Sequence, residues 1–280
     1  MTDAPQAELD GDVLNVKMPD GAMGWEQWFL LISDVHWDNP HCDRKLLEKH
    51  LTQAQERNAP IFSFGDFFCA MQGRGDPRNS KDSIRPEHTG GNYLDLLVDT
   101  AAEYLAPYPI MMLADGNHET SIRAKLETDL TKRLAKALGV NAMGYSGFIK
   151  FRFMMTGGGR SNKVLYFHHG SGGGGPVTKG VIRSNRQAVY LPDAQIVIGG
   201  HVHESWLLVQ PRVRLSNSDR VYLDNQYHLT GSTYKQEFNL AGGFHVERGR
   251  PPKPLGGWWM RFYWDNQQHG NVGVEFTLAT

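Results

Sequence analysis

The stretch QIVIGGHVH, residues 195–203, joins a short apolar run to two glycines and to two histidines, His201 and His203. A run such as residues 195–198, bounded by glycine, is typical of a buried β-strand. Histidine costs free energy to bury without a partner, so two of them directly after a buried strand indicate either a shared task or an accident, which the rest of the chain must decide. Open α/β sheets place their binding sites at the carboxyl ends of strands, and we therefore expect other strands of this chain to end in the same way.

Four other stretches repeat this pattern. Apolar runs at residues 28–33, 61–64, 109–114 and 164–167 are each followed by polar residues, in the motifs SDVH, FGD, DGNHE and FHHG. Together with GGHVH, these motifs supply Asp34, His36, Asp66, Asn117, His118, His168, His169, His201 and His203. The sequence therefore predicts one site, built where five strands end.

Helical patterns separate the first of these strands. Residues 43–58, 92–105 and 119–138 each place apolar residues on one helical face, and Gly139 is suited to end the third helix. The first half of the chain is therefore predicted to alternate strand and helix.

The second half changes to hairpins and strands. Residues 148–169 are typical of a hairpin, and four more strands are predicted after it. We expect one domain over residues 1–280, with an N-terminal extension at 1–24 and the strands of a second sheet at 204–280.

Residues 67–92 have no periodicity and directly follow a candidate site residue. Loops of this length inside a compact domain tend to be functional or disordered. One interpretation is an active-site insertion loop that covers the site or binds substrate, and the other is a surface excursion.

Composition limits the classes of function. The 280 residues carry a net charge of −1, so no global basic field favours non-specific binding to nucleic acid. Two cysteines, Cys42 and Cys69, are too few for a disulfide framework and favour free thiols in a reducing compartment. The N-terminus lacks the features of a signal peptide, and no apolar run reaches the roughly 18 residues of a membrane helix. We expect a cytoplasmic protein without membrane contact, and the sequence does not set an oligomeric state.

The strand-end residues are mainly carboxylates and imidazoles. Mixed oxygen and nitrogen donors suit borderline divalent metals such as Mn, Fe, Co, Ni or Zn. Seven or more candidates exceed what one ion requires from a protein, so two ions that share a bridging carboxylate fit better.

The motifs D-x-H, G-D, G-N-H-E, a strand-end H and G-H-x-H occur in this order between residues 34 and 203. In this arrangement the chain resembles the calcineurin-like metallophosphoesterase family. The resemblance implies an α/β fold, a four-layer α/β/β/α sandwich of two mixed β-sheets flanked by helices. It also implies two divalent metal ions, of Mn, Fe, Zn, Ni or Co, with Mn favoured.

The resemblance further implies roles for single residues. Asp34, His36 and His203 would bind the first metal, Asn117, His169 and His201 the second, and Asp66 would bridge both. A metal-bound hydroxide would attack phosphorus, and His118 would be catalytic, stabilising the phosphoryl group or protonating the leaving group. The neighbouring His168 is an alternative to His169, which we prefer because a glycine follows it.

One position departs from the family pattern. Many members have an acid or an amide three residues after the bridging aspartate, where it orients the histidine of G-N-H. This chain has Cys69 there, and a thiol is a weak hydrogen-bond partner. Another acid could substitute, and Asp38 and Asp76 are candidates.

The substrate is indicated by fewer residues. A run of four glycines, residues 172–175, follows FHHG, and exposed backbone N–H groups there could bind phosphate oxygens. Arg123, Lys179, Arg183 and Arg186 could bind a second phosphate or a nucleotide tail.

These features favour a phosphoester substrate that is a phosphodiester, such as a nucleotide or nucleic acid. The enzyme would then be a phosphodiesterase. Three alternatives stay open: a phosphomonoesterase or protein phosphatase of the same fold, a DNA nuclease, and a non-catalytic scaffold.

Overall fold

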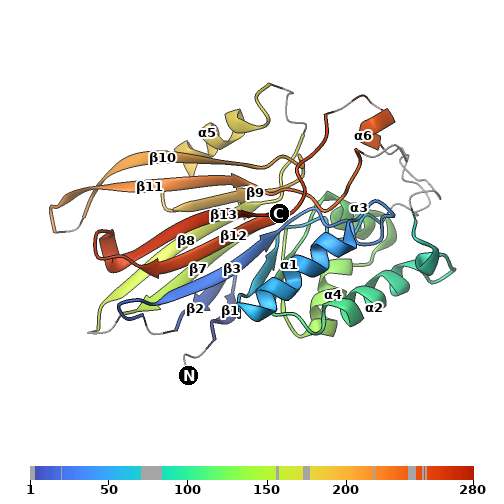
Figure 1. Cartoon of the computed structure of the whole chain (residues 1–280), viewed down its shortest axis with the longest axis horizontal. Coiled ribbons are helices and arrows are strands. Elements are labelled where there is room, and N and C mark those ends of the chain that lie inside the picture. The colour runs from blue at the N-terminus through green and yellow to red at the C-terminus, as the bar shows by residue number, and fades with distance from the viewer. Residues whose placement is uncertain are drawn as a thin grey trace.

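Two β-sheets and six α-helices are described by a computed structural model that covers residues 4–19, 21–70, 84–155, 158–172, 177–216, 218–238, 244–247, 249 and 251–280. Figure 1 shows the two sheets, with α1–α4 on one side of the molecule and α5 on the other.

The first sheet has six strands in the order β13-β12-β3-β4-β5-β6. Its parallel part consists of β3 (Glu26–Ile32), β4 (Ile61–Ser63), β5 (Ile110–Ala114) and β6 (Asn141–Met143). The strands β12 (Gly257–Trp264) and β13 (Val272–Ala279) add an antiparallel edge beside β3. A predicted site residue follows shortly after each of the first three parallel strands, namely Asp34, Asp66 and Asn117.

The second sheet has seven strands in the order β1-β2-β7-β8-β9-β11-β10. These are β1 (Gln6–Asp10), β2 (Val13–Lys17), β7 (Ser146–Met154), β8 (Arg160–His168), β9 (Ile196–Gly199), β10 (Trp206–Leu215) and β11 (Val221–Thr230). Because β8, β9 and β11 run parallel, their carboxyl ends meet at one edge.

Helices follow the strands of the first sheet. They are α1 (Arg44–Glu56), α2 (Tyr93–Leu105), α3 (Asn117–Leu126) and α4 (Leu130–Leu138), with α5 (Val181–Tyr190) and α6 (Phe244–Glu247) later in the chain. Two 3-10 turns, Pro86–His88 and His269–Asn271, complete the described elements. The Asp43 side chain begins α1 by accepting the backbone N–H of Leu46, as an N-cap does.

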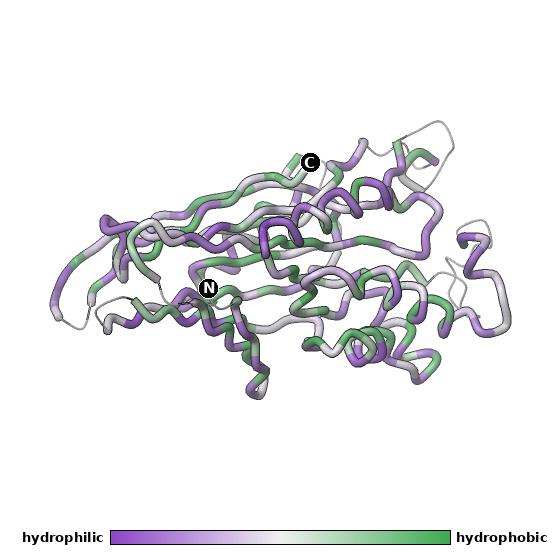
Figure 2. Tube along the Cα trace, turned by 60° about the horizontal axis from the view of Figure 1, so that its bottom comes forward, coloured by the Kyte–Doolittle hydropathy of each residue, from purple (hydrophilic) through white to green (hydrophobic). Residues whose placement is uncertain are grey.

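Buried apolar residues form three clusters, and these define the layers. One cluster packs α1, α2 and α4 against the first sheet, and includes Leu47, Leu97 and Leu134. The second lies between the sheets and is rich in phenylalanine, with Phe29 and Phe262 fully buried. A small third cluster around Leu191 lies on the outer face of the second sheet. Figure 2 accordingly shows hydrophobic stretches along the central strands. Along the helices, hydrophilic and hydrophobic residues alternate. The predicted α/β/β/α sandwich is confirmed.

Three details differ from the sequence-based expectations. Residues 1–24 are not a plain extension, because β1 and β2 are strands of the second sheet, where Leu14 and Val16 are fully buried. Residues 204–280 do not all join that sheet, because β12 and β13 pair with β3 in the first.

The helix predicted at residues 119–138 is two helices. Glu127 has a left-handed backbone with φ 53° and ends α3, and Asp129 caps α4 by accepting the N–H of Lys132. In the predicted loop at 67–92, residues 67–70 and Ile84 are buried, whereas 71–83 lie outside the described residues.

Candidate metal centre

Five chain segments converge where the two sheets meet. The segments after β3, β4 and β5 bring Asp34 and His36, Asp66, and Asn117 and His118 from the first sheet. The segments after β8 and β9 bring His169, His201 and His203 from the second sheet. The site therefore depends on the packing of one sheet against the other.

The first group of donor atoms is made by Asp34, His36 and His203. The Nε2 atoms of the two histidines are 3.3 Å apart, and His203 Nε2 is 3.3 Å from Asp34 Oδ1. Asp34 and His36 are buried, so this group lies below the surface.

The second group combines Asp66, Asn117, His169 and His201. His169 Nε2 lies 3.1 Å from Asp66 Oδ2 and 3.3 Å from Asn117 Oδ1. His201 Nδ1 approaches the same Asn117 oxygen to 2.6 Å. A distance of 4.0 Å between His169 Nε2 and Asp34 Oδ1 connects this group to the first.

These donors fit divalent ions. Ligand atoms that are each about 2.0–2.2 Å from one ion lie roughly 3 Å from one another, which is the spacing seen within both groups. All seven donors are oxygen or nitrogen atoms, a mixture that suits borderline metals such as Mn, Fe, Co, Ni and Zn. The residues present therefore suit two adjacent metal ions.

The backbone at this site is strained in a systematic way. Residues with side chains rarely adopt positive φ angles, yet five of the candidate ligands do. They are Asp34, His36, Asp66, His201 and His203, with φ between 50° and 71°. Such strain persists only where surrounding structure enforces it, and it clusters at functional sites.

Two glycines let the backbone approach the candidate ligands closely. A Cβ atom on Gly200 would clash with Ser33 Oγ and Asp34 Oδ2, and one on Gly116 would clash with Asp66 Oδ1. The backbone N–H of His201, which follows Gly200, donates to the Asp34 carboxylate at 3.0 Å. The second glycine of GGHVH is thus required by the contact that holds Asp34.

Charges within the centre shift the pKa values of its members. Burial and the neighbouring histidines lower the pKa of His36, which favours the neutral ring that binds metals. Burial opposes ionisation of Asp66, but His169 and His118 outweigh it and lower the pKa of this carboxyl. Burial likewise opposes protonation of His169, yet Asp66 and Asp34 raise its pKa to about 10. The carboxylates of Asp34 and Asp66 therefore favour positive charge at the place where metal ions would lie.

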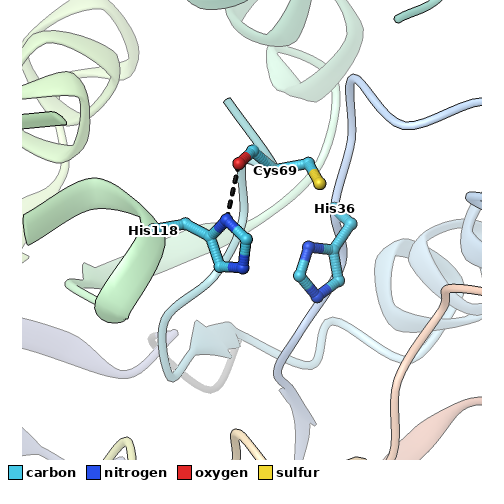
Figure 3. A group of neighbouring side chains, drawn as sticks. All are labelled: His36, Cys69 and His118. Atoms are coloured by element: carbon cyan, nitrogen blue, oxygen red, sulfur yellow. Dashed lines mark hydrogen bonds between the residues drawn. The ribbon is translucent and has the colours of Figure 1, made fainter. Parts of the chain in front are cut away.

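His118 lies beside this centre. Its Nε2 is 3.8 Å from Asp66 Oδ2, and its backbone N–H donates to Asp66 Oδ1 at 2.9 Å. Figure 3 shows its Nδ1 directed at the backbone carbonyl of Cys69, at 2.5 Å, with the ring of His36 close by. The Cys69 carbonyl thus takes the place of the side-chain partner that the sequence left open.

Asp38, one of the two suggested substitute acids, does not bind the His118 ring. Its carboxylate accepts the backbone N–H groups of Cys69 and Ala70 instead. The other candidate, Asp76, lies outside the described residues.

Glu119 is a residue of the site to which sequence reasoning gave no role. Its buried carboxylate accepts the N–H groups of Asp66, Phe68 and Gly116, so it ties the ends of β4 and β5 together. Burial and the charge of Asp66 raise its pKa to about 8. The signal was present in the sequence, because Glu119 stands three residues after the N-cap Gly116, as in a capping box.

The two adjacent histidines after β8 have different surroundings. The ring of His169 is fully buried in the second donor group, and its Nδ1 faces the carbonyl of Phe64 at 2.8 Å. His168 Nδ1 instead accepts the backbone N–H of Gly170, and its ring packs against Tyr145. The geometry favours His169 as the ligand.

The residues predicted to contact substrate have different surroundings. Arg123 is held by Asp115 and Asp129, at 2.7 and 2.9 Å. Lys179 and Arg186 are exposed. The Arg183 guanidinium lies against Gly170 and Gly199, where its buried Nε has no hydrogen-bond partner in the described part of the chain. Of the glycines at 172–175, only Gly172 is described.

Comparison with known proteins adds distant likenesses. No family model matches the sequence, and no curated protein matches it. Similar solved structures include GAP50, the anchor in the inner membrane complex of Plasmodium, at 12% identity over 91% of this chain and 85% of that one, with a TM-score of 0.42. Calcineurin-like phosphoesterase YfkN from Bacillus subtilis matches at 9% identity over 91% of each chain, with a TM-score of 0.39. Vps29 from Chaetomium thermophilum matches at 9% identity over 90% and 96%, with a TM-score of 0.38.

No helix among the described residues is long and apolar enough to cross a membrane. TM-scores this low do not support transferring a function from these structures to this chain. The resemblance to a family therefore rests on the chain's own motifs and geometry. In the order of its motifs, in its two-sheet architecture and in the convergence of its strand ends, the chain resembles the calcineurin-like metallophosphoesterases.

Proposed function

We propose that the protein is a metal-dependent phosphoester hydrolase, and specifically a phosphodiesterase that acts on a nucleotide or another phosphodiester. One observation carries this proposal: two adjacent groups of oxygen and nitrogen donors lie beside the His118 imidazole, which is in neither of them and comes within about 4.8 Å of donor atoms of His36 and Cys69. Neighbouring divalent ions with a separate acid or base nearby are the parts that phosphoester hydrolysis requires.

Bound divalent ions would supply Lewis acidity and would lower the pKa of coordinated water to about 7. Asp34, His36 and His203 would hold one ion, Asn117, His169 and His201 the other, and Asp66 would lie between them. The chain itself provides His118. Its Nδ1 bonds the Cys69 carbonyl, so its Nε2, which lies 3.8 Å from Asp66 Oδ2, would exchange a proton with the leaving group.

Arg183 supports a diester over a monoester. Its pKa is lowered by burial, and no carboxylate pairs with it in the described residues. A partly buried charge without a partner is costly, so this guanidinium favours an anionic ligand. Beside a phosphoryl group bound at the metals, that ligand would be a second phosphate or another acidic part of the substrate.

The test compares hydrolysis of bis-(p-nitrophenyl) phosphate and p-nitrophenyl phosphate by Mn-reconstituted protein. We expect the diester to be preferred, and Asp66→Asn to remove both bound metal and activity. A large preference for the monoester would contradict the diester assignment and favour a phosphomonoesterase or protein phosphatase.

Two further outcomes separate the remaining functions. Cleavage of oligonucleotides that is lost in Arg183→Ala would indicate a DNA nuclease. Elemental analysis that finds no transition metal, together with no metal-stimulated hydrolysis, would indicate a non-catalytic scaffold. Both cysteines are free and buried, which supports the proposed cytoplasmic location.

A further inference from the structure

We propose that Asp38 and Tyr93 are positioning residues for His118, and that they act through the backbone of Cys69. The inference rests on the proposed function, because it assigns a purpose to residues around the imidazole of that site. It concerns Cys69, the position at which the chain departs from the pattern of the metallophosphoesterase family.

The first step is the contact between His118 and Cys69. A carbonyl oxygen can only accept a hydrogen bond, so His118 Nδ1 must carry the proton in the 2.5 Å contact with the Cys69 carbonyl. This fixes the tautomer of the neutral ring and leaves Nε2 facing Asp66. The orientation of His118 therefore depends on where the Cys69 peptide is held.

The Cys69 thiol does not provide that hold. Figure 3 shows the carbonyl oxygen of Cys69 on the side of His118 and its sulfur on the other side. The sulfur accepts from Asn39 Nδ2 at 3.3 Å, and burial raises the pKa of the thiol to about 12. The thiol is thus a neutral packed group, and the backbone orients the imidazole.

Asp38 fixes that backbone. Its two carboxylate oxygens accept the N–H groups of Cys69, at 2.6 Å, and Ala70, at 2.8 Å. Ala70 has a φ of 50°, which is unfavourable for alanine, so the turn needs such an anchor. Asp38 is fully buried, and hydrogen bonds to a buried carboxylate are strong ones.

Tyr93 completes the arrangement. Its hydroxyl donates to Asp38 Oδ2 at 2.7 Å from the first residue of α2. Asp38 itself lies two residues after the candidate ligand His36, in a segment whose backbone pairs with the chain after β4. Asp38 therefore connects the turn that orients His118 both to α2 and to the metal-binding segment.

The substitution Tyr93→Phe tests this chain of contacts, with Tyr104→Phe as a matched control. Both tyrosines are on α2, but the buried Tyr104 hydroxyl has no hydrogen-bond partner among the described residues. We expect Tyr93→Phe to lower kcat about tenfold and Asp38→Asn about 10²-fold, because small misplacements of a catalytic group are costly. Tyr104→Phe should match the wild type, and bound metal should be unchanged in both tyrosine variants.

Two measurements separate positioning from a general structural effect. The decrease in kcat of Tyr93→Phe should be larger for substrates with poor leaving groups, because these depend most on the proton that His118 donates. In the His118→Ala background, Tyr93→Phe should change kcat less than about twofold, because the group that it positions is gone. Equal losses in both backgrounds, or equal effects of Tyr93→Phe and Tyr104→Phe, would overturn the proposal.

A further measurement does not depend on activity. Nitrogen-15 NMR of labelled histidine should show His118 protonated at Nδ1 in metal-free protein, and a mixture of tautomers in Asp38→Asn. A neutral wild-type ring that is protonated at Nε2 and not at Nδ1 would refute the positioning role even in an active enzyme. If the wild type hydrolyses no phosphoester but has the expected tautomer, the proposed function fails while the positioning contact stands.

Discussion

At the scale of single residues, the candidate centre combines side chains suited to bind metal with glycines whose missing Cβ atoms let the backbone approach those side chains. Gly116 is the clearest case of the second kind, because a Cβ atom there would clash with Asp66 Oδ1 and with the Asp66 backbone nitrogen. The neighbouring Asn117 and His118 both belong to the site, so movement of this peptide would displace them together.

We therefore expect Gly116→Ala to lose bound metal and to lower kcat/KM by at least about 10²-fold, as misplaced groups do. The matched control is Gly144→Ala, at the end of β6, where a Cβ atom would meet nothing within 4 Å. Metal content from elemental analysis and the rate of diester hydrolysis provide the comparison. Normal metal content in Gly116→Ala would mean that the Asp66 carboxylate is not needed where the structure places it.

At the scale of elements, sequence patterns predicted where strands lie along the chain better than which strands pair in a sheet. Apolar runs predicted β3, β4, β5 and β9, because a buried strand needs no information beyond its own residues. The sheet to which β12 and β13 belong depends on contacts with β3, more than 200 residues earlier in the sequence, and no local pattern encodes that pairing. For the same reason the sequence predicted the candidate metal ligands, which follow strands, but not the hydrogen bonds of Asp38 with Cys69, Ala70 and Tyr93.

The break between α3 and α4 has a local cause in the sequence. The apolar stripe continues across residues 126–130, but Asp129 is a good N-cap, and Glu127 takes the left-handed conformation that ends a helix. Glutamate is strained in that conformation, whereas glycine is not.

Glu127→Gly should therefore raise the free energy of unfolding by about 0.5–1 kcal/mol, since relief of strain exceeds the added freedom of the unfolded chain. The same exchange at the exposed Glu103, inside α2, should lower it by about 1 kcal/mol. Urea denaturation of both variants measures the two free energies. Changes of the same sign would show that the backbone at residue 127 does not control the end of α3.

At the scale of the whole molecule, the candidate centre joins the two sheets. Asp34, His36, Asp66 and Asn117 follow strands of the first sheet, and His169, His201 and His203 follow strands of the second. Metal ions bound by both sets would favour the folded arrangement, because the unfolded chain does not bring these donors together.

Divalent metal should therefore stabilise the protein, by about 2.7 kcal/mol for each bound ion when its free concentration is 100 times Kd. Thermal unfolding with Mn²⁺ and with a chelator measures this difference, which Asp66→Asn should abolish. Phe262→Ala is the control, since this fully buried side chain lies in the cluster between the sheets, away from the donor atoms. It should destabilise the protein by about 3–5 kcal/mol in either condition and leave the metal increment intact. A metal increment that persists in Asp66→Asn would place the bound ion elsewhere on the chain.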